Sequence, residues 1–100
     1  MAASLSIAAQ LLMFRESANL EVTISRSGNE YRVKVNSCGD EICSSSWSLS
    51  SRQEAINAVR KTFLQVEETA KEFGRVSPLW TQRSENMLKN LETQDRVTAT

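Results

Sequence analysis

The sequence contains no histidine, and this absence limits the chemistry that one chain can perform. Histidine is the usual general base and a common metal ligand, so Ser-His-Asp and Cys-His nucleophiles and His-ligated metal sites are excluded. The two cysteines, Cys38 and Cys43, are too few to hold zinc on their own. Four residues separate them, a spacing that could close a hairpin disulfide in a secreted protein. We expect two reduced thiols instead.

The acidic residues show no arrangement suited to catalysis. Asp40-Glu41 and Glu67-Glu68 are adjacent pairs, and neighbouring side chains on a strand or helix diverge instead of meeting at one substrate atom. Glu67 lies four residues before Lys71, which is the spacing of a surface ion pair on a helix. Serine and lysine are both present, but no motif marks a Ser-Lys dyad, and no glycine-rich loop could hold a phosphate. The sequence therefore predicts a protein that is not an enzyme and that has no metal and no cofactor.

Alternating apolar and polar residues predict a β-hairpin. The alternation runs over 20–25 and again over 31–35. Between these segments lies Gly28-Asn29, a pair suited to a two-residue turn in which glycine adopts a positive φ. Such a turn pairs Ile24 with Val33 and places the apolar residues of both strands on one face.

A third strand is expected over about 41–49, and its register decides where Trp47 lies. With a two-residue loop before it, Trp47 pairs with Arg32 and lies on the outer face of the sheet. With one more residue in the loop, Trp47 pairs with Tyr31 and is buried together with Leu49. We favour the buried position, because the other register would bury serines in place of apolar side chains.

Three helices complete the predicted fold. Residues 4–15 carry apolar residues at helical spacing. A capping box, Ser51-Arg-Gln-Glu54, begins a long helix that Gly74 ends. Ser77-Pro78 begins a third helix that ends near Leu91. This order predicts an α+β fold, α-β-β-β-α-α, in which the long helix packs on a three-stranded antiparallel meander and the N- and C-terminal helices flank it.

Basic residues on the expected outer face of the sheet and at the start of the long helix suggest contacts with nucleic acid. They are Arg26, Arg32, Lys34 and Arg52. However, twelve basic residues are balanced by twelve acidic ones, whereas proteins that bind nucleic acid usually carry an excess of basic charge. Nucleic-acid binding is therefore the alternative prediction, and it ranks second.

Sequence motifs in the same region resemble those of a known family. Residues 4–64 resemble the double-stranded RNA-binding domain through Tyr31-Arg-Val-Lys-Val35, Gly39 and Ser51-Arg-Gln-Glu-Ala55, followed by Ala58, Val59 and Leu64. The resemblance implies an α-β-β-β-α core, in which a second helix beginning with serine grips phosphates through lysines. Here Arg52 occupies one of those basic positions, while Gln53 and Ile56 stand where the family has lysines.

The apolar stripe of the long helix is the strongest functional signal. A helix from Ser51 to Phe73 extends about 34 Å, whereas a six-residue strand extends about 20 Å. The third helix has few large apolar residues to cover the excess, so we expect an exposed remainder that forms an interface. The predicted interface residues are Val66, Ala70, Phe73, Trp80, Met87, Leu88 and Leu91. The leading prediction is a small, non-enzymatic protein–protein interaction module, a regulatory or adaptor protein that binds a protein partner and acts as a homodimer.

The N-terminal segment bears on the compartment. Residues 1–14 have no Lys or Arg before their apolar part, and that part is too short to cross a bilayer. We therefore expect a cytoplasmic protein with no membrane partner. A single domain is expected over 1–94, followed by a flexible polar tail over 95–100.

Overall fold

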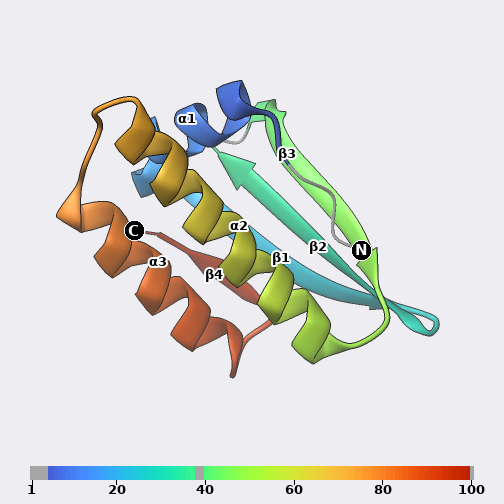
Figure 1. Cartoon of the computed structure of the whole chain (residues 1–100). Helices are drawn as coiled ribbons and strands as arrows, with labels where there is room; N and C mark the ends of the chain where they lie inside the picture. Colours follow the sequence, from blue (N-terminus) through green and yellow to red (C-terminus); the bar gives the residue numbers. More distant parts are fainter. Residues whose placement is uncertain (1–4, 38–39, 100) are drawn as a thin grey trace.

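The computed structural model describes residues 5–37 and 40–99, with the backbone alone over 40–44. Its elements are α1 (Ile7–Arg15), the short 3-10 helix η1 (Ser17–Asn19), β1 (Leu20–Ser27), β2 (Glu30–Ser37), β3 (Asp40–Leu49), α2 (Arg52–Glu72), α3 (Pro78–Leu91) and β4 (Arg96–Thr98). The strands form one antiparallel sheet in the order β3-β2-β1-β4. The three α-helices lie together on one face of this sheet, with α2 between α1 and α3 (Figure 1).

The α+β class and the antiparallel sheet are confirmed, but the predicted number of strands is wrong. The fourth strand, β4, lies in the segment that was expected to be a polar tail. It pairs with β1, and the Ala99 amide donates to the Leu20 carbonyl at 3.0 Å. Val97 is buried opposite Val22. One buried valine between polar neighbours is a weak sequence signal for a strand. Contacts with the neighbouring strand β1, which local sequence does not reveal, stabilise β4.

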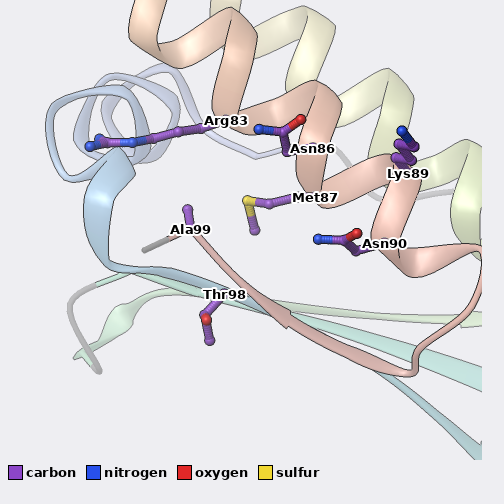
Figure 2. Close-up of a pocket in the computed structure, with 7 residues that line it drawn as sticks. All are labelled: Arg83, Asn86, Met87, Lys89, Asn90, Thr98 and Ala99. Atoms are coloured by element: carbon purple, nitrogen blue, oxygen red, sulfur yellow. The ribbon is translucent and has the colours of Figure 1, made fainter.

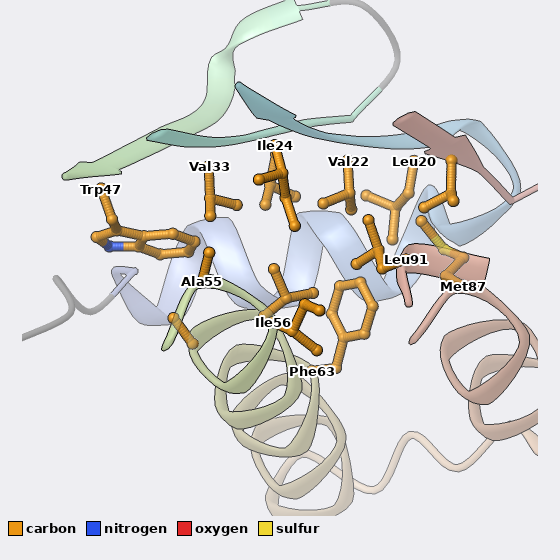
Figure 3. Close-up of a cluster of buried hydrophobic side chains, with 14 of the residues drawn as sticks. Leu20, Val22, Ile24, Val33, Trp47, Ala55, Ile56, Phe63, Met87 and Leu91 are labelled. Carbon is orange, nitrogen blue, oxygen red and sulfur yellow. The ribbon is translucent and has the colours of Figure 1, made fainter. Parts of the chain in front are cut away.

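The predicted hairpin is confirmed in register. Ile24 pairs with Val33 and Val22 with Val35, and all four residues are buried. Figure 3 shows Val22, Ile24 and Val33 on the helical side of the sheet. Gly28 has φ +61°, the positive value that the turn requires.

Trp47 is buried as favoured, but its predicted pairing is wrong. It lies opposite Val33, not Tyr31 or Arg32. The β2–β3 register shifts between Val35 and Ser37, and this irregularity adds residues to β3. The observed partner, Val33, lies two residues from the predicted partner, Tyr31, so Trp47 is on the predicted face of the sheet but has a different neighbour. Its indole Nε1 is buried and has no hydrogen-bond partner among the described residues.

The two ends of α2 are fixed by the residues that the sequence identified. At the start, the Ser51 hydroxyl accepts a hydrogen bond from the Glu54 amide at 3.1 Å. At the end, the amides of Gly74 and Arg75 donate to the carbonyls of Lys71 and Ala70, and Gly74 has φ +70°. These are the two bonds of a Schellman motif, which ends the helix and turns the chain sharply.

Candidate functional site

Most of the predicted interface residues lie inside the chain's own core. Val66, Ala70, Trp80, Met87 and Leu91 are each at most 2% exposed. They cannot form a contact surface while the chain is folded, so the predicted interface is corrected at these five positions. Leu88 is half-buried, and Phe73 is the one member that is well exposed.

Part of the cover of α2 and α3 comes from α1. The ring of Trp80 lies between Phe14 of α1 and Phe63 of α2, with centroid distances of 6.0 and 5.4 Å. Towards the end of α2, the Thr69 hydroxyl donates to the side-chain carbonyl of Gln10 in α1. The first and third helices together therefore cover the part of α2 that extends beyond the strands.

A turn with three exposed apolar side chains remains at the connection between α2 and α3. We call it the apolar turn: Phe73 is 56% exposed, Val76 72% and Leu79 56%. The Schellman bonds at Gly74 fix the backbone of this turn. Val76 and Leu79 fall outside the apolar stripe of α2, which is why the stripe alone did not identify them.

The outer sheet face is polar and carries two of the predicted nucleic-acid contacts. Arg32 lies between Ser25 and Ser48 on the neighbouring strands, and Lys34 occupies the corresponding place one pair along β2. Both cations are exposed, and neither forms an ion pair with a described residue. Because Trp47 points to the other face, this face lacks the large aromatic side chain on which a base would stack.

The other two predicted nucleic-acid contacts are occupied elsewhere. Arg26 lies on the opposite face at the hairpin end, where its guanidinium carbon is 5.8 Å from the centroid of the Tyr31 ring. Arg52 points towards the connection between α3 and β4, where it donates to the Leu91 carbonyl at 2.5 Å and pairs with Asp95 at 3.3 Å. The four predicted contacts therefore do not form one surface.

A polar cleft of about 310 Å³ lies between α3 and β4 (Figure 2). Its lining residues are Arg83, Asn86, Met87, Lys89, Asn90, Thr98 and Ala99. Neither a carboxylate side chain nor a thiol lines it. Across the described residues, no group of acidic, cysteine or histidine side chains is arranged to hold a metal ion.

Cys38 and the side chain of Cys43 lie outside the described residues, so the state of these thiols stays a prediction. Among the described helices, none is long and apolar enough to span a bilayer.

Comparison of this chain with protein-family models, with curated proteins and with solved structures finds no match.

Proposed function

We propose that the protein is a small non-enzymatic protein–protein interaction module, which acts as a homodimer and binds a partner protein through the apolar turn. The observation that supports this proposal is the distribution of exposed apolar side chains. Among the described residues, every exposed large hydrophobic side chain lies on a helix or on the α2–α3 connection: Ile7, Leu64, Phe73, Val76 and Leu79. The sheet face presents serine, threonine and charged side chains instead.

The apolar turn has the character of a binding anchor. Full burial of a large apolar side chain contributes about 1.5–3 kcal/mol, and aromatic residues at the centre of an interface often dominate the binding energy. Phe73 is such a residue, and its exposed ring has Val76 and Leu79 nearby in the chain. The partner protein should therefore have a hydrophobic recess that accepts the Phe73 ring.

Phe73→Asp tests the proposal, because the exposed position tolerates the charge without unfolding the chain. Ser48→Asp is the matched control, since it adds the same charge on the exposed outer sheet face. The wild type and both variants are immobilised and exposed to extract of the source cell, with and without nuclease. We expect specific proteins to be retained by the wild type and by Ser48→Asp, in both conditions, and to be lost with Phe73→Asp.

Two results would contradict this function. Retention of the same proteins by Phe73→Asp would show that the apolar turn is not the anchor. Loss of all specific partners after nuclease treatment would show that nucleic acid is the real ligand. Circular dichroism of each variant establishes that the fold is intact, and Val66→Asp serves as the unfolded reference because Val66 is fully buried.

A further inference from the structure

The outward face of α2 carries charges in an order that is symmetric about one apolar residue. Arg60 and Lys61 precede Leu64, and Glu67 and Glu68 follow it. Arg60 and Glu68 lie four positions on either side of Leu64, and Lys61 and Glu67 lie three positions on either side. At about 100° per residue, all four charged side chains fall within about 60° of the direction of Leu64. We call these five residues the α2 stripe.

Four residues of the α2 stripe are exposed, namely Arg60, Lys61, Leu64 and Glu68, whereas Glu67 is half-buried beside Thr81 of α3. Leu64 is 54% exposed, although it is a large apolar side chain in the middle of a helix. Beside it, Phe63 and Leu88 line a shallow groove of about 220 Å³ between α2 and α3. The stripe therefore has an apolar centre, with basic charge on one side and acidic charge on the other.

The acidic half of the stripe has Lys71 four residues after Glu67, whereas the basic half has no such partner within α2. No acidic residue lies three or four positions from Arg60 or Lys61, the spacing at which a helix forms internal ion pairs. None of the four charged groups forms an ion pair with a described residue. Arg60 donates to Asn57 at 3.1 Å, and Glu67 accepts from the Thr81 hydroxyl at 2.9 Å.

We propose that a second copy of this chain binds the α2 stripe, with the two α2 helices antiparallel and a two-fold axis passing beside Leu64. In this arrangement, Leu64 of each copy meets the other at the axis, next to the groove between α2 and α3. Arg60 and Lys61 then lie opposite Glu67 and Glu68 of the partner subunit, because an antiparallel two-fold exchanges the two halves of the helix. The basic half of each copy lies opposite the acidic half of the other copy, so the surface is complementary to itself.

This inference rests on the homodimer in the proposed function, and it names the surface that forms it. It does not involve the apolar turn, since Phe73 lies nine positions, or about 14 Å, along α2 from Leu64. The two surfaces can therefore be tested separately.

Two charge-reversed variants test the two-fold arrangement. Arg60→Glu/Lys61→Glu makes the α2 stripe wholly acidic, and Glu67→Lys/Glu68→Lys makes it wholly basic. We expect the wild type to dimerise in sedimentation velocity, and each variant alone to bind itself at least about tenfold more weakly, since every cross-axis pair becomes repulsive. An equimolar mixture of the two variants should form a heterodimer, because all cross-axis pairs then attract each other.

Arg32→Glu/Lys34→Glu is the matched control. It produces the same change in net charge as the acidic variant, but on the outer sheet face. We expect it to dimerise like the wild type. Higher ionic strength should weaken the wild-type dimer, because the pairs at its rim are open to solvent.

A cysteine cross-link tests the position of the axis. In a background with Cys38→Ser and Cys43→Ser, Leu64→Cys should give a disulfide-linked dimer on mild oxidation, because position 64 of the two copies meets at the axis. Leu79→Cys in the same background should not.

The outcomes separate this inference from the proposed function. A monomeric wild type at about 100 µM would overturn both the two-fold arrangement and the homodimer, while partner binding through Phe73 would stand or fall on its own test. A dimer that persists in both charge-reversed variants, or that forms no cross-link at position 64, would overturn the α2 arrangement alone.

Discussion

Trp47 illustrates how one side chain can be well packed and yet leave a polar group unpaired. Its ring is 4% exposed and lies in the core beside Val33 and Ala55 (Figure 3). Its Nε1 nevertheless has no hydrogen-bond partner among the described residues. A buried donor without a partner costs about 1–3 kcal/mol, so part of what the ring contributes to stability is lost at its nitrogen.

Substitutions at Trp47 should therefore separate packing from polarity. We expect Trp47→Ala to lower the free energy of unfolding by about 3–5 kcal/mol, because it leaves a cavity in the core. Trp47→Phe should cost much less, because it keeps most of the ring volume and removes the unpaired donor. Urea denaturation measures both changes. Equal losses for the two variants would contradict this account, as would red-shifted emission that iodide quenches readily in the Trp80→Phe background.

Glu54 contributes to the start of α2 through its charge. Its carboxylate accepts hydrogen bonds from the hydroxyl and the amide of Ser50. The hydroxyl bond is the main cause that lowers the pKa of Glu54 below its ordinary value. A lowered pKa means that the folded chain favours the ionised carboxylate.

The pKa shift of Glu54 predicts the direction of a pH effect. Because the folded pKa is the lower one, the stabilisation is complete above the pKa of the unfolded chain, about 4.3, and disappears as the pH falls through the folded value. We expect Glu54→Gln to be less stable than the wild type at pH 7, with the difference shrinking below about pH 4. Thermal denaturation across this range measures it. A difference that grows in acid would contradict the assignment.

At the scale of elements, β4 is held by contacts from outside the sheet as well as within it. The Arg52 guanidinium, at the first residue of α2, donates to the carbonyls of Leu91 and Gln94 at 2.5 and 3.3 Å. It also pairs with Asp95, directly before β4. Carbonyl groups at the end of a helix have no partner within it, so Arg52 satisfies the Leu91 carbonyl that α3 leaves free. A single side chain thus connects the start of α2, the end of α3 and the start of β4.

Arg52→Ala should loosen β4 more than the rest of the sheet. We expect a loss of about 1–2 kcal/mol in the free energy of unfolding, with faster amide exchange at Ile24 and Ala99, whose amides donate across the β1–β4 pair. Arg52→Lys should restore little, because an ammonium group cannot reproduce the fork of the guanidinium. Arg32→Ala, on the exposed outer face, is the control and should stay within about 0.5 kcal/mol of the wild type. Unchanged exchange at Ala99 in Arg52→Ala would contradict this role.

The whole molecule has two unlike sides. The helical side carries all of the exposed large hydrophobic side chains among the described residues, and the sheet side is polar. On the sheet side the Arg96 guanidinium pairs with Glu21 at 2.6 Å, which leaves Arg32 and Lys34 as the described cations without an ion pair there. Two such cations in a chain of zero net charge make a weak site for a polyanion.

The free protein should therefore not bind nucleic acid tightly. We expect no submicromolar complex with duplex RNA, duplex DNA or single strands at about 50 mM salt, measured by fluorescence anisotropy. A complex that weakens steeply between about 50 and 200 mM salt would reverse this ranking, and Arg32→Ala and Lys34→Ala would then each flatten the salt slope by roughly one.

Elements whose signals are local could be predicted from the sequence alone. The hairpin register follows from the alternation of apolar residues and from one turn glycine, and both ends of α2 follow from Ser51 and Gly74, because these effects act within a few residues. The sequence favoured a buried Trp47 without fixing it, since one of the two possible registers placed apolar side chains of β3 on the core face and the other placed serines there.

Features that depend on contacts between distant parts of the chain could not be predicted from the sequence. The irregularity in β3 chose the partner of Trp47, and β1 gave a partner to the short strand β4. Most of the predicted interface residues are buried in the core, because α1 and α3 both cover α2. Arg52 donates to the carbonyl at the end of α3 instead of lying on an open surface. Whether a side chain is buried, or a helix end is capped, by a residue far away in the sequence depends on which elements meet in space. Local patterns of polarity do not contain that information.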